Sequence, residues 1–245
     1  MFRYKIYIEY KGTNYVGWQK QKNGISIQFA IESAIKKLTK EYSEVFGAGR
    51  TDSGVHALSQ VAHFDSKKKI NVETIRDGLN NYLRPQPISI LKAKKVSIKF
   101  HARFSAKQRH YLYRIINRRP PLTVDQDLAW IINKNLNFVK MKKACKFLIG
   151  KFDLKAFRSS SCQSKVTIKT IDEVKLKKNK NEIIILVKAK SFLHSQVRIM
   201  VGTLVSVGEN KIKPSDLRNI IKEGKRKNAG PTAPAGGLYL KKIIY

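Results

Sequence analysis

The eleven residues Gly47–Ala57, GAGRTDSGVHA, include three glycines, an arginine, an aspartate and a histidine. Glycine loses more backbone entropy on folding than any other residue, and a carboxylate inside a fold must be paired or hydrated. Asp52 is ionised at neutral pH, and a cation such as Arg50, two residues earlier, favours that state. An ionised carboxylate beside an arginine suits nucleophilic attack, or stabilisation of positive charge on a sugar, better than general-acid catalysis. The alternative is a salt bridge that only shapes a glycine-rich turn.

The segments that flank this loop predict strands and helices in mixed order. Residues 3–10 alternate along the chain as a half-buried strand does. Residues 26–40 place an apolar stripe on one side of a helix and lysines on the other. The same patterns predict a short strand before the loop, further strands at 60–65, 88–98 and 108–116, and a second helix at 74–83.

The second half of the chain repeats this mixed order. Helices are expected at 136–149, 194–207 and 214–222, and strands at 165–176, 182–189 and 238–244. The run IIILV at 183–187 is apolar enough for a central strand. The chain is therefore expected to be α+β, with two mixed α/β units whose antiparallel sheets adjoin and a cleft at their junction. The expected domains are 1–116 and 124–245, with the basic linker NRRPPLT at 117–123.

Charge is the most unusual feature of the composition. The chain has 50 Lys and Arg against 17 Asp and Glu, a formal net charge of +33. Such an excess indicates a polyanionic partner, nucleic acid first, although an AT-rich genome would also enrich lysine. No apolar run approaches the roughly 18–20 residues of a membrane-spanning helix, and the N-terminus lacks the pattern of a signal peptide. A cytoplasmic protein is therefore expected.

Several other site classes are disfavoured by residue spacing. The five histidines and two cysteines show no metal-ligand or CxxC spacing, so neither a metal site nor a disulfide framework is expected. No phosphate-binding GxxxxGK[ST] motif is present. Ser53 and His56 lie three residues apart without an acid to orient the histidine, which disfavours a hydrolase triad.

Five segments, in order, resemble the motifs of the TruA family of tRNA pseudouridine synthases. The first two in the chain are YKGTN with GWQ at 10–19, and the GAGRTDSGVHA loop with QVAHF at 60–64. The others are FHARFSA with RHYLY at 100–113, VR with VGTL at 197–204, and AGPTAP with GLYL at 229–240. The chain departs from the family pattern at 150–157, where GKFDLKAF replaces GxHDFxxF. Five motifs spanning residues 10–240 make a chance resemblance negligible.

The resemblance implies a pseudouridine synthase fold with a central RNA-binding cleft. It also implies an isomerisation that relinks uracil to ribose through carbon, with no cofactor and no metal. Family substrates are uridines 38, 39 and 40 in the anticodon stem-loop of tRNA, bound across a homodimer. Asp52 would be the catalytic aspartate, which either attacks the ribose C1′ or assists glycosidic cleavage; the sequence does not decide between these routes.

The remaining roles implied by the resemblance follow by matching positions. Tyr111 matches the tyrosine that stacks on the flipped target base, Arg50 the arginine that helps to flip it, and Arg198 the arginine that pairs with the catalytic aspartate. Arg103 and Arg109 are expected to contact phosphates, with a solvated surface charge as the alternative.

A non-catalytic RNA-binding or RNA-chaperone protein on the same fold is the competing hypothesis. It explains the charge, but RNA binding alone does not require the Asp52 carboxylate, which would repel phosphates. A basic ribosome-associated structural protein would likewise explain the charge but not the motif.

Overall fold

The computed structural model describes residues 1–245, which form two compact units. The first unit comprises Met1–Lys107 together with Tyr239–Tyr245, and the second comprises Gln108–Leu238. The expected domains 1–116 and 124–245 divide the chain differently. Strand pairing accounts for the difference, because the strand that begins at Gln108 pairs within the second unit and the C-terminal strand pairs with a strand of the first.

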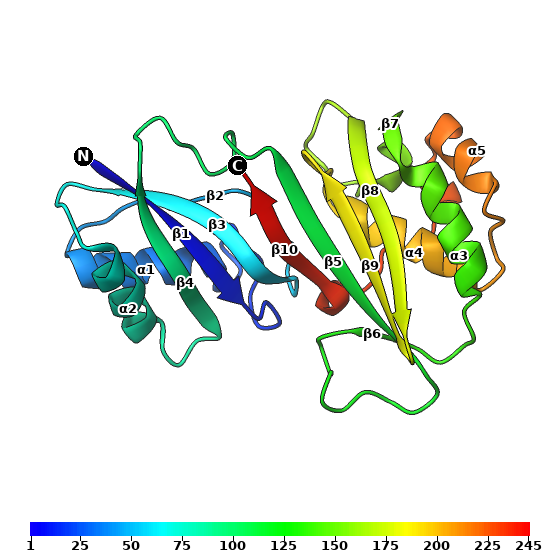
Figure 1. The fold of residues 1–245 in the computed structure, drawn as a ribbon, viewed down its shortest axis with the longest axis horizontal. Helices are drawn as coiled ribbons and strands as arrows, with labels where there is room; N and C mark the ends of the chain where they lie inside the picture. Colours follow the sequence, from blue (N-terminus) through cyan, green and yellow to red (C-terminus); the bar gives the residue numbers. More distant parts are fainter. The chain divides into compact units, whose positions relative to one another are not determined.

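The first unit is a sheet with two helices on one face (Figure 1). Its strands are β1 (Phe2–Tyr10), β2 (Phe46–Gly47), β3 (His56–Ser66), β4 (Ile88–Val96) and β10 (Leu238–Ile244), and its helices are α1 (Ile27–Thr39) and α2 (Val72–Leu83). The strand order is β4-β1-β3-β10, with β2 also paired to β3. Strand β1 runs antiparallel to both β3 and β4, and β10 runs parallel to β3. The alternation in β1 buries Tyr4, Ile6 and Ile8 in the core.

The second unit has the same mixed composition. Its strands are β5 (Gln108–Asn117), β6 (Trp130–Ile132), β7 (Gly150–Asp153), β8 (Ile168–Asn179) and β9 (Glu182–Ala189), and its helices are α3 (Phe138–Cys145), α4 (Gln196–Gly208) and α5 (Asp216–Glu223). The order β5-β9-β8-β7 is antiparallel throughout, and β6 pairs parallel to β5. The IIILV run lies in β9, which has a strand on each side, as predicted. Helices and mostly antiparallel strands in both units confirm the α+β class.

Local sequence signals explain where several helices begin and end. The Ser26 hydroxyl accepts the N–H of Phe29 at the start of α1, and Gly224 follows α5 in the left-handed conformation. The expected helix 136–149 is shorter than predicted, because α3 ends at Cys145 and a 3-10 turn over Lys146–Leu148 leads into β7. Strands β6 and β7 were not predicted; they are three and four residues long and depend on their pairing partners.

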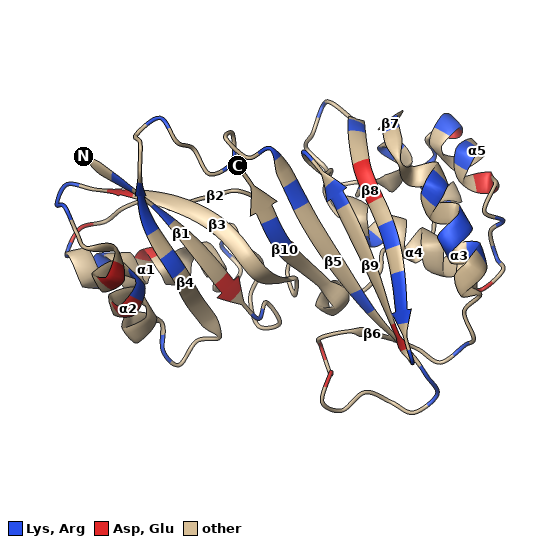
Figure 2. Cartoon of the chain, viewed as in Figure 1, with Lys and Arg blue, Asp and Glu red and all other residues tan.

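Positive charge is spread over both units. Figure 2 shows Lys and Arg on β4 of the first unit and along β8 and α3 of the second. Every helix is too short or too polar to span a membrane.

Candidate active site

The glycine-rich loop Gly47–Ala57 leads from β2 into β3 in the first unit. Its start is fixed by the N–H of Ala48, which donates to the carbonyl of Val61 at 2.8 Å. The N–H of Val55 donates to the carbonyl of Asp52 at 3.2 Å and closes a tight turn. Asp52 is half-buried in this turn and Arg50 is exposed. The fold therefore holds the carboxylate while leaving its residue in contact with solvent.

The N-terminal segment 10–18 is hydrogen-bonded to the residues on both sides of Asp52. Before it, the Trp18 N–H donates to the Thr51 carbonyl at 3.0 Å, and the Tyr10 and Thr51 hydroxyls share a hydrogen bond of 2.8 Å. After it, the Ser53 hydroxyl donates to the Tyr15 carbonyl at 3.0 Å. The two neighbours of Asp52 are thus tied to a segment distant in sequence. This explains how a loop outside any helix or strand holds a carboxylate in a fixed place.

Two glycines of that segment make the close approach possible. A Cβ on Gly12 would lie 2.0 Å from the carbonyl oxygen of Val55, a distance that no side chain tolerates. Gly17 has φ +109°, and a Cβ there would lie 2.7 Å from the carbonyl oxygen of Thr51. The glycines of the N-terminal motif therefore serve the loop that carries Asp52.

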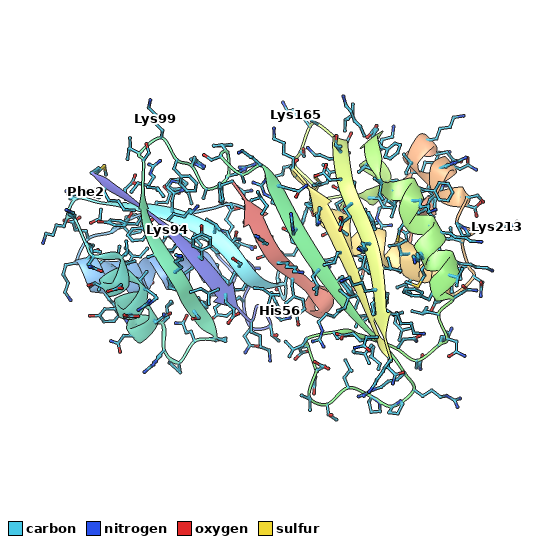
Figure 3. The ribbon with its side chains drawn as sticks, in the orientation of Figure 1. Phe2, His56, Lys94, Lys99, Lys165 and Lys213 are labelled. Atoms are coloured by element: carbon cyan, nitrogen blue, oxygen red, sulfur yellow. The ribbon has the colours of Figure 1, made fainter.

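Two buried polar side chains hold the ends of the loop. The Nδ1 of His56 (labelled in Figure 3) accepts the N–H of Gly12 at 2.9 Å. The centroid of its ring lies 4.8 Å from that of the Tyr239 ring. The Gln60 amide donates to the carbonyl of Gly49 at 2.7 Å. Because Nδ1 is an acceptor, neutral His56 carries its proton on Nε2. His56 thus holds the N-terminal segment against the end of the loop.

In the second unit, Tyr111 and Tyr113 lie on the same side of β5. Tyr111 is 8% exposed, and its ring meets that of Phe192 edge to face at 5.2 Å between centroids. Tyr113 is fully buried, and its hydroxyl donates to the carbonyl of Pro234 at 2.8 Å. Burial raises the pKa of Tyr113 far above its ordinary value. Tyr113 therefore packs in the sheet, with its hydroxyl anchored.

Arg198 lies in the first turn of α4 and is half-buried. Its Nε donates to the carbonyl of Ala233 at 2.8 Å, and the N–H of Ala233 donates back to the carbonyl of Arg198 at 3.2 Å. The charge of Arg198 lowers the pKa of the Tyr113 hydroxyl, against the larger opposite effect of burial. Arg198 and Tyr113 are thus anchored to the consecutive carbonyls of Ala233 and Pro234.

The loop that supplies these carbonyls, residues 229–234, packs directly on α4. A Cβ on Gly202 would lie 1.8 Å from the carbonyl oxygen of Pro231, and the N–H of Gly230 donates to the Thr203 hydroxyl at 2.8 Å. The VGTL and AGPTAP motifs therefore form one packed structure. Residue type does not single out Ala233, because its contribution is a backbone carbonyl, which every residue has.

Arg103 and Arg109 have different surroundings. Arg103 is exposed, with its guanidinium 5.5 Å from the centroid of the Phe104 ring. Arg109 is buried, and its guanidinium donates to the carbonyl of Lys190. Exposure suits Arg103 to a phosphate contact, whereas the bond made by Arg109 suits it to ordering the chain just after β9.

The predicted site residues divide between the two units. Arg50, Asp52 and Arg103 belong to the first unit, and Arg109, Tyr111 and Arg198 belong to the second. No three His, Cys, Asp or Glu side chains are grouped closely enough to hold a metal ion.

The chain is similar to known proteins of one family along most of its length. A family described as tRNA pseudouridine synthase matches residues 6–105 and 144–245. Proteins named tRNA pseudouridine synthase A are similar over nearly the whole chain. The protein from Ehrlichia chaffeensis is 51% identical over 99% of this chain and 100% of its own. The protein from Parvibaculum lavamentivorans is 46% identical over 100% of both chains. The protein from Wolbachia pipientis wMel is 48% identical over 99% of this chain and 100% of its own.

Among solved structures, a chain titled "Crystal Structure of a Cbf5-Nop10-Gar1 Complex" aligns over 82% of this chain and 54% of its own. The sequence identity is 11% and the TM-score is 0.33, a likeness too weak to support any argument.

Proposed function

The chain belongs to the tRNA pseudouridine synthase family and isomerises uridine to pseudouridine in tRNA, and from this premise we propose that its targets are uridines 38, 39 and 40 of the anticodon arm. The proposal carries over the substrate of the TruA family on the five motifs that the chain shares with it. The structure supports treating these motifs as parts of one site architecture, because they pack together in pairs. The 10–19 motif fixes the Asp52 loop, and the VGTL helix fixes the AGPTAP loop.

We propose Asp52 as the catalytic group. The observation that carries this proposal is that the residues before and after Asp52, Thr51 and Ser53, are both held by hydrogen bonds. Such fixation places a carboxylate within the narrow limits that catalysis requires. By attack at C1′ or by stabilising positive charge on the ribose, the carboxylate promotes cleavage of the N1–C1′ bond, whose electron pair stays with uracil. The uracil turns and C5 bonds to C1′, which on the attack route displaces the Asp52 carboxylate from C1′. The C5 proton then leaves while N1 gains one, so the reaction is an isomerisation.

The target uridine must leave its stack to reach a carboxylate, which costs a few kcal/mol. We propose that Tyr111 offsets this cost by stacking on the base, an interaction worth about 1–3 kcal/mol. The edge-to-face contact with Phe192 supports this role, because it holds the tyrosine ring in one orientation. Arg50 is exposed and suited to help the base out of the helix, and Arg198 is proposed as the partner of the Asp52 carboxylate.

The excess of Lys and Arg suits binding of an RNA backbone. With Arg103 and about five other cations on phosphates, tRNA affinity should fall about a thousandfold between 50 and 200 mM salt. We assign Arg109 to ordering the chain near Lys190, because its guanidinium is buried against that carbonyl. We also propose, from the family pattern, a homodimer that works in the cytoplasm.

The test uses tRNA transcripts with tritium at uridine C5, incubated with the unaltered protein and with Asp52→Asn. The unaltered protein should release label into water, and mapping should place pseudouridine at positions 38–40. Asp52→Asn should bind the same tRNA and release no label. Release with pseudouridine elsewhere would refute the anticodon-arm proposal, and release by Asp52→Asn at the full rate would refute the role of Asp52.

A further inference from the structure

The most exposed aromatic ring of the first unit is Phe104, which is 74% exposed. It lies in the connection 97–107 that follows β4, in the FHARFSA motif. A single exposed ring is common on protein surfaces, so the role of Phe104 depends on the rings that support it and the cations beside it. Neither Tyr111 nor Asp52, the residues assigned to the target uridine, lies in this connection.

Phe104 is the outermost ring of a connected group, which we call the Phe104 ring group: Phe46, His63, His101 and Phe104. The His101 ring lies 4.4 Å from Phe104, 4.8 Å from His63 and 5.7 Å from Phe46, measured between centroids. The rings of Phe46 and His63 are stacked at 5.1 Å, and His63 is buried. The ring group thus runs from the core to the surface and supports Phe104 from beneath.

The connection that carries Phe104 is held by hydrogen bonds to its backbone. The Nδ1 of His101 accepts the N–H groups of Arg103 and Phe104 at 3.1 and 3.4 Å. The N–H of Ala102 donates to the Nδ1 of His63 at 3.1 Å, and its carbonyl accepts the Tyr245 hydroxyl at 2.8 Å. The backbone at Phe104 is therefore ordered before binding, and the contact with His101 orients the ring, as in a preformed stacking surface.

Both imidazoles act as acceptors, and their protonation states agree with that geometry. Burial lowers the pKa of His63 to about 4, and burial together with the charges of Arg3 and Arg103 lowers the pKa of His101. The two rings are therefore neutral at pH 7, and the hydrogen bonds that position Phe104 persist at that pH.

The segment that carries Phe104 has charges of one sign only. Residues 96–107, VSIKFHARFSAK, contain Lys99, Arg103 and Lys107 and no Asp or Glu. The Arg103 guanidinium lies over the Phe104 ring, 5.5 Å from its centre, so a stacking base would take the place of this cation or use the other face of the ring. Figure 3 shows the Lys99 side chain pointing away from the ribbon. An exposed ring flanked by cations matches the two parts of a nucleotide, a flat base and a phosphate.

We propose that Phe104 is a second nucleobase-stacking site, on which an unpaired base of the bound tRNA other than the target uridine stacks while its phosphate pairs with Arg103. The site adds affinity and orients the RNA without taking part in the chemistry. It rests on tRNA as the substrate and does not depend on which uridine is modified.

The experiment measures dissociation constants for a full-length tRNA transcript in the Asp52→Asn background, so that the RNA stays unreacted. Phe104→Ala and Phe104→Leu should each weaken binding about tenfold, because leucine keeps an apolar side chain but offers no ring face. Phe104→Trp should bind within about twofold of the parent. In the protein with Asp52 intact, Phe104→Ala should raise the KM of label release and leave kcat unchanged.

The matched control is Phe29→Ala, which removes another exposed phenylalanine of the first unit, 51% exposed on α1. It should not change the dissociation constant. A set of transcripts, each with one abasic site at an unpaired position, identifies the base, since loss of that base should abolish the difference between Phe104 and Phe104→Ala.

Equal binding by all Phe104 variants, or an equal loss in Phe29→Ala, would overturn the proposal. A change in sedimentation from dimer to monomer in Phe104→Ala would also overturn it, because a second copy of the chain would then cover the ring. The position of pseudouridine, mapped separately, tests the anticodon-arm proposal, so the two can fail independently.

Discussion

The two units hold their predicted site residues by different means. In the first, Asp52 lies in a loop, and Thr51 and Ser53 on either side of it are bonded to the segment 10–18. In the second, Tyr111 lies on β5 and Arg198 on α4, so the hydrogen bonds of a strand and a helix place their backbones. The loop residue depends on contacts with a distant segment, whereas the other two depend mainly on their own elements.

Because of this difference, activity and stability should respond separately to substitutions in the two units. A contact between the loop and the segment 10–18 positions the carboxylate but adds little to the core, so its loss should slow the reaction more than it unfolds the protein. A contact made by a buried side chain of β5 or α4 belongs to the core of the second unit. Its loss should therefore lower the free energy of unfolding more than it lowers activity.

The largest expected contrast between the units is in how the free energy of unfolding depends on pH. The first unit should lose stability in acid. His63 has a pKa of about 4 in the folded protein, chiefly because it is buried, against an ordinary value of 6.5. Between these values the unfolded chain binds a proton that the folded chain does not. Stability is therefore full above pH 6.5 and falls by on the order of 3 kcal/mol as the pH drops to about 4.

The second unit should respond to alkali. Burial raises the pKa of the Cys145 thiol to about 12, against 9.0, and that of Tyr113 in the same direction. Above pH 9 the unfolded thiol loses a proton that the folded thiol keeps, so stability is full below pH 9 and is lost as the pH rises toward about 12.

Urea unfolding measured across this pH range checks both limbs. His63→Asn, whose amide oxygen replaces Nδ1 as an acceptor, should reduce only the acid limb. Cys145→Ala should reduce only the alkaline limb, to which Tyr113 also contributes. Unchanged limbs in these variants would show that other groups cause the pH dependence.

The next largest effect is expected from Gly17→Ala, which tests the fixation of the loop. The added Cβ meets the Thr51 carbonyl oxygen at 2.7 Å, and a φ of +109° disfavours alanine. Thr51 must move, and Asp52 with it. We expect kcat/KM for label release to fall about a hundredfold, equivalent to about 2.7 kcal/mol, while the helix and strand content by circular dichroism is kept.

Gly150→Ala is the matched control, because Gly150 also has a positive φ, +131°, but lies at the start of β7 in the second unit. It should lower the unfolding midpoint and leave the kcat/KM of the folded protein unchanged. If both variants lost activity in proportion to stability, the loop would have no special dependence on the segment 10–18.

The sequence predicted those parts of the fold that local patterns determine. Strands β1, β9 and β10 follow from alternation or from a continuous apolar run, and their observed ends lie within about a residue of the predicted ones. The three-residue β6 and the place of β10 beside β3 depend on hydrogen bonds to remote strands, which no local pattern contains.

The same limit applies to the candidate site. Asp52 and Arg50 stood out because a carboxylate and a cation in a glycine-rich loop are an unusual combination. The need for glycine at positions 12 and 17 was not predictable. It arises because the loop that carries Asp52 packs directly against both residues. Ala233 was missed for a related reason, since any residue supplies a carbonyl and only the geometry shows that Arg198 uses it.

Tyr113→Phe tests the second unit, where a lost contact should lower stability rather than activity, and its expected effect is smaller. The variant removes only the hydroxyl that donates to the carbonyl of Pro234. Loss of one such bond at a buried residue should cost about 1.5 kcal/mol and lower the Tm by roughly 3–6 °C. Calorimetry measures this shift. We expect kcat to change less than about twofold, and a loss of kcat without a change in Tm would reverse the assignment of this contact to the core.

Tyr10→Phe should give the smallest effect. It makes the same chemical change as Tyr113→Phe, but in the first unit, so the two variants compare the units directly. It removes the hydroxyl that shares a hydrogen bond with Thr51, next to Asp52. The bond is worth about 1 kcal/mol, which corresponds to about fivefold in rate if it serves to position the carboxylate. Single-turnover label release should therefore fall about fivefold with the dissociation constant for tRNA unchanged, since the hydroxyl is buried and does not meet the RNA. A lower Tm with an unchanged rate would place Tyr10 with Tyr113, and the loop would then be held by its glycines and backbone bonds rather than by this side chain.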